Sequence, residues 1–245
     1  MRNVLLLKAG DANNAVRTAL GDYDRWFVQT IGQSNVHFDV VHAHLNQKLP
    51  EQPKDWDAVI MTGSPLSVTE PAEWMRRSAD FMRNAAEKKV PVLGVCFGQQ
   101  LLAWSLGGQV IRNPEGREIG TITVALTREG QSDPLFKDLP AEFAVQATHE
   151  DIVEAPMQGV EILAHNANTK MQAMRVGNYL RGVQFHPEAQ ADTMAALIKA
   201  RAEKLEAEAV ARGASKGERV PKLLAGIRAA PFGKKILDNF LTNFT

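Results

Sequence analysis

The sequence predicts an α/β fold, with a three-layer, doubly wound, mostly parallel sheet and an added antiparallel β region. Short apolar runs such as residues 3–7 and 91–95 are typical of buried parallel strands. Segments with helical spacing of apolar residues alternate with these runs, which indicates helices on both faces of the sheet. From about residue 109 to 185 the segments become shorter and more strand-like, as expected of antiparallel or mixed pairing.

The first half of the chain supplies the parallel strands and their connecting helices. The expected strands span residues 3–7, 36–45, 57–63 and 91–95. The expected helices span residues 15–31, 71–89 and 97–108. Gly32 is expected to stop the first helix, and Pro71 suits the first turn of the second. Alternation of this kind favours a parallel, doubly wound sheet.

The second half is expected to begin with five short strands. These are GTITVAL (120–126), EFAVQAT (142–148), GVEILAH (159–165), MQAMRV (171–176) and YLRGVQF (179–185). A long Ala/Glu/Lys-rich helix is expected over 192–212, followed by a polar linker over 213–221 and an amphipathic helix over 236–244. The length of 245 residues suits one large α/β domain or two small ones.

Charge and cysteine content narrow the class of protein. Lys plus Arg equals Asp plus Glu at 28 each, so electrostatics gives no reason to expect a nucleic acid or an acidic membrane as partner. The single cysteine excludes an internal disulfide and fits a reducing compartment. The apolar run near the start is too short for a signal peptide, and no run reaches the ~20 residues of a membrane span. We therefore expect a cytoplasmic protein.

The only cysteine, Cys96, lies in the stretch Gly94-Val95-Cys96-Phe97-Gly98 between an expected strand and an expected helix. This arrangement is that of a nucleophile elbow with sulfur in place of oxygen. Glycines two residues away on either side allow neighbouring backbone to approach closely. The partial positive charge at the start of the helix favours the thiolate. The alternative is a buried core cysteine, which the glycine frame argues against.

A thiolate that attacks an amide needs an acid–base partner, and His186 is the candidate. It follows an expected strand, and Pro187 favours an extended conformation at His186. Glu188 lies two residues further on, so its side chain points the same way as the imidazole and can orient it. Together these residues form a Cys-His-Glu arrangement with the roles of a catalytic triad. Taken alone, His-Pro-Glu is equally typical of a surface turn.

The stretches GVCFGQQLLA (94–103) and GVQFHPE (182–188) resemble the class I glutamine amidotransferase domain, the triad glutaminase found in GMP synthetase and carbamoyl-phosphate synthetase. The resemblance covers about residues 40–190 in ordered motifs, and the final helix also fits. It implies a flavodoxin-like fold over a single domain, residues 1–245. It also implies that Cys96 attacks the side-chain amide of glutamine, that His186 acts as base and then acid, and that Glu188 orients it.

The resemblance further implies an oxyanion hole and a glutamine pocket. The backbone N–H groups of Phe97 and Ser64, with Gly63 before it, take the oxyanion positions, although the family usually has glycine where Ser64 stands. One such donor is worth about 3 kcal/mol. Gln100 matches a position that touches bound glutamine in the family, but is also typical of a helix surface. His149 and Asp151, in ATHEDIVEAP (147–156), match a GMP synthetase stretch that lines the glutamine pocket, although either residue is also compatible with a structural role.

The chain departs from the larger members of the family in two respects. No synthetase domain follows the glutaminase motifs, and about 40 residues, near 192–230, form a helical insertion before the closing helix. Stand-alone members similar to the GMP synthetase glutaminase carry a similar insertion. The resemblance thus implies a small-molecule substrate, glutamine or a γ-glutamyl compound, and a separate synthetase subunit as a candidate acceptor of ammonia. No metal or organic cofactor is expected.

Four functions are weighed on this basis. The first is hydrolysis of glutamine to glutamate and ammonia through a γ-glutamyl thioester. The second is the same chemistry on a γ-glutamyl peptide, as in plant relatives that act on glutathione conjugates. The third is a catalytically silent binding or regulatory module, against which the intact Cys96, His186 and Glu188 argue. The fourth is an α/β-hydrolase esterase, which is disfavoured because the acid there precedes the histidine.

Three further features are interpreted as structural. His42 and His44 share one strand face but have no third ligand beside them, which favours a solvated face over a metal site. The turn NPEGREIG (113–120), with Glu115, Arg117 and Glu118, is interpreted as a solvated hairpin in preference to a surface near the pocket. The helix over 192–212 is expected to pack on its own domain.

Overall fold

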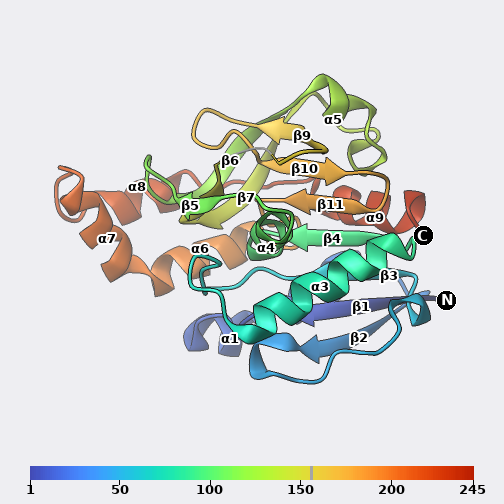
Figure 1. The fold of residues 1–245 in the computed structure, drawn as a ribbon. Coiled ribbons are helices and arrows are strands. Elements are labelled where there is room, and N and C mark those ends of the chain that lie inside the picture. The colour runs from blue at the N-terminus through green and yellow to red at the C-terminus, as the bar shows by residue number, and fades with distance from the viewer. Residues whose placement is uncertain (155–156) are drawn as a thin grey trace.

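A nine-stranded mixed sheet lies at the centre of the protein, with helices on both faces (Figure 1). The structure is a computed structural model and describes residues 1–154 and 157–245. The strand order is β2-β1-β3-β4-β11-β10-β9-β6-β7. This order confirms the predicted α/β class, because one half of the sheet is parallel and the other half is the added antiparallel region.

The parallel half comes from the first part of the chain and one late strand. Its members are β2 (Val36–His42), β1 (Arg2–Lys8), β3 (Ala58–Met61), β4 (Val92–Val95) and β11 (Leu180–Val183). All residues of β3, β4 and β11 are buried. This burial on both faces explains why β3 and β4 contain no polar side chain. The pairing of β11 with β4 brings Val183 opposite Val95. The residues that follow these two strands therefore meet at one edge of the sheet.

The antiparallel half continues from β11. It consists of β10 (Ala173–Val176), β9 (Val160–His165), β6 (Glu118–Leu126) and β7 (Glu142–His149). A separate two-stranded sheet pairs β5 (Val110–Arg112) with β8 (Asp151–Val153). The sequence did not indicate this small sheet, because a strand of three residues carries too little periodicity. Of the stretch 147–156, the last two residues lie outside the described part of the chain.

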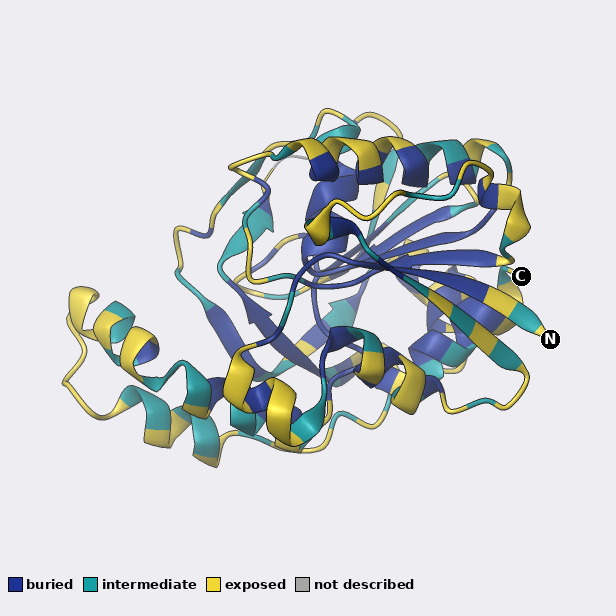
Figure 2. Cartoon of the chain, turned by 90° about the horizontal axis from the view of Figure 1, so that it is seen from below, coloured by how far each residue is buried: buried dark blue, intermediate teal, exposed yellow. Residues whose placement is uncertain are grey.

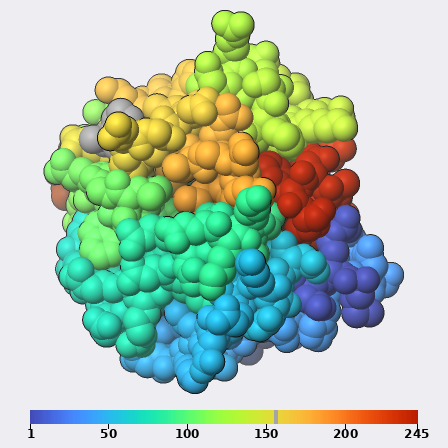
Figure 3. Space-filling view, turned by 45° about the vertical axis from the view of Figure 1, so that its right-hand side comes forward, coloured from blue at the N-terminus to red at the C-terminus, as the bar shows by residue number. Residues whose placement is uncertain are grey.

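Helices cover both faces of the sheet. On one face lie α3 (Glu73–Glu87) and α4 (Phe97–Ser105), and on the other lie α2 (Tyr23–Ile31) and α9 (Gly233–Asn243). The central strands are buried and the outer surfaces of the helices are exposed (Figure 2). The chain ends meet, since Arg2 donates to Thr245 Oγ1 at 2.8 Å, and Figure 3 shows the C-terminal helix beside the N-terminal residues. None of the helices in the described ranges is long and apolar enough to cross a membrane.

Two of the predicted helices are broken. The helix expected over 15–31 is α1 (Asn14–Leu20) followed by α2, because Asp22 caps α2 by accepting from the N–H of Tyr23. Gly32 does end α2, with a left-handed φ of 57°. The helix expected over 192–212 is α6 (Ala191–Ala200) and α7 (Ala202–Ala211).

The predicted end of the linker over 213–221 is wrong, because α8 (Arg219–Ala225) already begins at Arg219. In residues 1–154 and 157–245, the remaining short elements are α5 (Arg128–Ser132) and the 3₁₀ turns at Ala43–Leu45, Pro53–Asp55 and Pro134–Phe136. Met194, Leu197 and Leu205 of the segment over 192–212 are buried in one apolar cluster with residues of α1 and α2, so this segment packs on its own chain as predicted, although Val210 stays exposed.

Candidate active site

Cys96 stands at a sharp turn between β4 and α4. Its φ of 52° and ψ of −104° are strained for a residue with a side chain, and its N–H donates to the carbonyl of Val183 at 2.7 Å. A Cβ on Gly94 would lie 2.5 Å from the carbonyl oxygen of Gly98, and a Cβ on Gly98 would lie 2.6 Å from that of Met61. Both flanking glycines are therefore required for the turn, as the sequence predicted.

His186 follows β11 and meets Cys96 at the same edge of the sheet. Gly63 lies between them: a Cβ there would be 2.7 Å from Cε1 of His186 and 3.6 Å from Cβ of Cys96. His186 Nδ1 donates to Oε1 of Glu188 at 2.7 Å. Its Nε2 is buried and has no hydrogen-bond partner among the described residues. Nδ1 is thus held by a carboxylate, while Nε2 is left for the thiol or a substrate.

Charge raises the pKa of His186 to about 10. Burial by itself lowers this pKa, because it penalises the imidazolium. The negative charge of Glu188, its hydrogen bond to Nδ1 and the nearby Cys96 sulfur outweigh the burial. The arrangement therefore favours the imidazolium form of His186, which the Glu188 carboxylate holds beside the Cys96 sulfur.

Tyr23 of α2 completes the setting of the imidazole. Its ring is stacked on that of His186, with centroids 6.5 Å apart and planes inclined by 22°, and Trp26 packs edge-on against Tyr23. Burial raises the pKa of the Tyr23 hydroxyl. Sequence reasoning did not single out Tyr23, because an aromatic residue at helical spacing is the ordinary signal of a core position.

The two expected oxyanion donors lie beside Cys96. The N–H of Phe97 is the first of α4, and neither it nor the N–H of Ser64 has an acceptor among the described residues. The Phe97 ring is buried and stacked on Trp74 at 5.7 Å, which fixes the start of the helix. Ser64 Oγ donates to the carbonyl of Ala9 at 2.8 Å and accepts from the N–H of Leu66. The hydroxyl thus holds the turn that the family usually makes with glycine.

The three expected substrate-binding residues are linked to one another. Gln100 Nε2 donates to the carbonyl of Asp151 at 2.8 Å, and Nδ1 of His149 donates to the same carbonyl at 3.1 Å. The carboxylate of Asp151 accepts from Ser67 Oγ at 2.5 Å. All three residues line a pocket that also contains Cys96. Gln100 is 3% exposed, so the alternative of a helix-surface glutamine is wrong.

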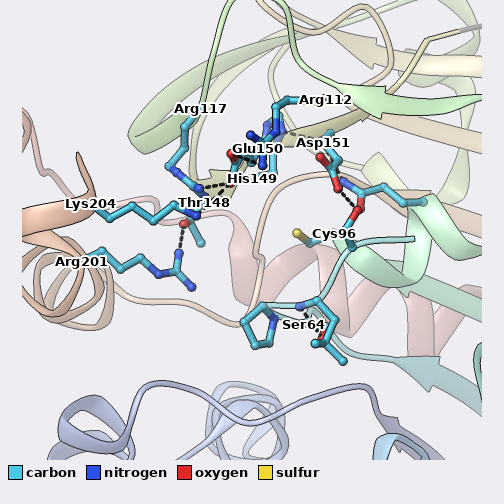
Figure 4. A pocket seen from close by; sticks show the side chains of 14 residues that line it. Ser64, Cys96, Arg112, Arg117, Thr148, His149, Glu150, Asp151, Arg201 and Lys204 are labelled. Atoms are coloured by element: carbon cyan, nitrogen blue, oxygen red, sulfur yellow. Dashed lines mark hydrogen bonds and ion pairs between the residues drawn. The ribbon is translucent and has the colours of Figure 1, made fainter. Parts of the chain in front are cut away.

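This pocket has a volume of about 260 Å³ and reaches from Cys96 to the inserted helices (Figure 4). Four cationic side chains face it, two from the β-rich part of the chain and two from the segment around α7. They are Arg112, Arg117, Arg201 and Lys204. They come from widely separated stretches, so only the fold brings them together.

The interpretation of residues 113–120 as a solvated hairpin is wrong. Arg117 lines the pocket with only 9% of its side chain exposed, and Glu118 is buried. Glu118 accepts from Nε2 of His149 at 2.9 Å, and also from Asn166 and Gln172. Burial raises the pKa of Glu118, but these hydrogen bonds and the charge of His149 outweigh it and lower the pKa. Glu118 is therefore an anion that fixes His149 behind the pocket wall.

His42 and His44 lie away from the pocket. Their ring centroids are 6.1 Å apart, and Nδ1 of His44 donates to the carbonyl of Lys8 at 3.0 Å. The two histidines do not share a strand: His42 is the last residue of β2, and His44 lies in the 3₁₀ turn that follows. Over residues 1–154 and 157–245, no group of three or more His, Cys, Asp or Glu side chains is arranged to hold a metal ion.

Comparison with known proteins agrees with this geometry. The family model described as glutamine amidotransferase class-I matches residues 19–204, a span that includes Cys96, His186 and Glu188. The chain belongs to the class-I glutamine amidotransferase family. It is accordingly a cysteine-nucleophile enzyme of that family, as the sequence predicted.

Relatives at the level of sequence are GMP synthases. The chain is 35% identical over 169 residues to a GMP synthase (glutamine-hydrolyzing) subunit from Saccharolobus solfataricus, a match covering 69% of this chain and 85% of that protein. It is 35% identical to GMP synthase (glutamine-hydrolyzing) from Thermomicrobium roseum, over 68% of this chain but only 30% of that protein. The chain thus corresponds to one part of the longer enzymes and to most of the shorter, separate subunit.

Relatives at the level of structure extend over the whole chain. A glutamine amidotransferase from Thermotoga maritima superposes with a TM-score of 0.75 at 22% identity, covering 99% of this chain and 97% of that one. One from Methylobacillus flagellatus gives a TM-score of 0.77 at 21% identity, with 100% and 96% covered. At this identity the likeness concerns the fold alone.

Proposed function

We propose that the protein hydrolyses the side-chain amide of glutamine to glutamate and ammonia through a γ-glutamyl thioester on Cys96. The observation that carries the proposal is the meeting of Cys96 and His186 around Gly63 at the edge of a pocket. Family membership supports the reaction class. The assignment of individual residues rests on this geometry and on the motifs around Cys96 and His186.

In the first half of the reaction, the Cys96 thiolate attacks the amide carbon, and the carbonyl oxygen becomes an oxyanion. The N–H groups of Phe97 and Ser64, with Gly63 allowing close approach, stabilise that charge. The imidazolium of His186 donates its Nε2 proton to the departing nitrogen, so that ammonia leaves and the thioester remains. The raised pKa of His186 supports the imidazolium as the starting form.

In the second half, neutral His186 takes a proton from water, and the resulting hydroxide equivalent attacks the thioester. The C–S bond breaks, glutamate leaves, and the thiolate–imidazolium pair is restored. Glu188 holds Nδ1 throughout and stabilises each imidazolium. Gln100, His149 and Asp151 shape the wall that receives the glutamyl group.

We further propose that the ammonia passes to a separate synthetase subunit and that the protein works in a reducing cytoplasm, where its thiol stays reduced. Relatives that are themselves named as subunits of GMP synthase support a separate partner. We retain the division into one amidotransferase domain, residues 1–245, with a helical insertion at about 192–230, as a proposal. A superposition that covers 99% of this chain and 97% of a glutamine amidotransferase chain supports this division.

The test is release of glutamate and ammonia from glutamine, with the Cys96→Ala variant in parallel. Wild-type protein is expected to release both products in equal amounts, and the variant neither. Catalytic silence of the wild type, with no labelling of Cys96 by a glutamine-like electrophile, would refute the proposal and favour a binding module.

A further inference from the structure

The segment that follows Glu188 places an arginine in the pocket. The helices α6 and α7 meet at Arg201, which ends one and begins the other with φ −110° and ψ 13°. Leu197 and Leu205 on either side are at most 2% exposed, so the backbone of Arg201 is fixed in the fold. Figure 4 shows Arg201 and Lys204 extending from this segment towards the side of the pocket where Cys96 lies.

Three of the four pocket cations have carboxylate partners. Arg112 and Arg117 both pair with Glu150, and Arg117 also pairs with Glu208 at 3.0 Å. Lys204 pairs with Glu150 at 3.2 Å and with Glu208 at 3.7 Å. Each of these three cations thus has a carboxylate within ion-pair distance, although the three share only Glu150 and Glu208.

Arg201 differs from the other three cations. Among the described residues, no carboxylate lies within ion-pair distance of its guanidinium. Its side chain is instead held by the hydrogen bond that Nη1 donates to Thr148 Oγ1 at 2.5 Å. A guanidinium carries five N–H donors and stays protonated, so most of its hydrogen-bonding capacity remains for a ligand. Thr148 orients the group without neutralising it.

We propose that Arg201 binds a carboxylate of the substrate and thereby selects γ-glutamyl compounds that carry one in the matching place. A guanidinium binds a carboxylate through two parallel hydrogen bonds, which suits a rigid pocket wall. The proposal rests on the proposed function and assigns a specificity residue to the inserted segment. The carboxylate has two possible sources: the α-carboxylate of the γ-glutamyl group, or a carboxylate on the leaving amine.

Paired substrates separate these two sources. Glutamine and 4-aminobutanamide differ only in the α-carboxylate, whereas γ-glutamylglycine and γ-glutamyl methylamide differ only in the carboxylate of the leaving amine. Each pair is compared in wild-type and Arg201→Gln protein by kcat/KM. The same four compounds are titrated calorimetrically against both proteins in a Cys96→Ala background, so binding is measured even without turnover.

Loss of the charge is expected to weaken binding, and to lower kcat/KM, by about 10- to 100-fold for compounds bearing the recognised carboxylate. The compound that lacks this carboxylate should be bound equally by both proteins, and Arg201→Lys should recover part of the loss. Arg212→Gln, also in the inserted segment but bonded to the carbonyl of Pro114, is the matched control and should behave as wild type.

An equal effect of Arg201→Gln on both members of each pair, or no effect on any compound, would overturn the proposal. Thermal unfolding of the variants shows whether an equal loss comes from damage to the fold. If the wild type hydrolyses none of the four compounds, the proposed function is refuted instead. In that case, the calorimetric comparison still decides whether Arg201 binds a carboxylate.

Discussion

Replacement of Gly63 by alanine tests whether the backbone at this residue holds the imidazole against the thiol. The new Cβ would lie 2.7 Å from Cε1 of His186, whereas ordinary contacts begin at 3.4 Å. The ring must therefore retreat by about 0.7 Å, and a displacement of about 1 Å at a reacting group costs on the order of 10²-fold in rate. The ring has little freedom, because Glu188 holds Nδ1 and Tyr23 packs on its face.

We expect Gly63→Ala to lower kcat for glutamine about 10²-fold and the free energy of unfolding by about 1–3 kcal/mol, the usual cost of overpacking. Steady-state ammonia release and urea unfolding measure the two effects. Gly226→Ala is the matched control, because its φ is −84° and its new Cβ would only make ordinary contacts at 3.5 Å. Activity of Gly63→Ala within twofold of wild type would refute the reasoning that this backbone positions His186.

Two further substitutions and two pH dependences follow from the same geometry. Glu188→Gln removes the anion that holds Nδ1 of His186. The kcat for glutamine, measured in a stopped assay, should therefore fall about 10²–10⁴-fold. An unchanged kcat would exclude an orienting role for Glu188. Because the pKa of His186 is raised to about 10, its contribution to stability is complete below the unfolded value near 6.5 and is lost as pH rises through about 10. In urea unfolding, the free energy of unfolding of the wild type should fall as pH rises from about 6.5 to about 10. The Glu188→Gln variant should show a smaller fall over this range. Equal pH dependences in the two proteins would contradict the pairing of His186 with Glu188. The pKa of Glu118 is lowered, so its contribution is present above the unfolded value of about 4.5 and is lost as pH falls through the folded value. Glu118→Gln leaves the buried donors of His149, Asn166 and Gln172 with a poorer acceptor and should cost about 1–3 kcal/mol. It should also weaken the acid dependence of stability, whereas a change within about 0.5 kcal/mol would show that the Glu118 hydrogen bonds are dispensable.

Local signals in the sequence were sufficient for the strands of the main sheet and for the turn around Cys96, but not for the short strands β5 and β8. The run Val92–Val95 is apolar because all its residues are buried. Gly94 and Gly98 flank Cys96 because a Cβ at either position would lie about 2.5 Å from a backbone oxygen. The motif after β11 likewise predicted that His186 and Glu188 would lie together, because i and i+2 share a face in extended chain.

Features that depend on distant contacts were not predictable. The break between α1 and α2 comes from Asp22, which accepts from Ala12 and pairs with Lys8, while the apolar periodicity continues through it. The burial of Glu118 depends on donors from three later segments, and a carboxylate in a glycine-rich turn looks solvent-exposed in sequence. Arg201 enters the pocket only because α6 and α7 pack back on the domain.

Covalent trapping tests the central claim most directly. The protein is mixed with glutamine, quenched in acid within the first turnover, and analysed by intact mass and peptide mapping. We expect one γ-glutamyl group on Cys96 in wild-type protein, none in Cys96→Ala, and slower formation in a His186→Ala variant. A γ-glutamyl group on another residue, or rapid hydrolysis of glutamine by Cys96→Ala, would contradict the account.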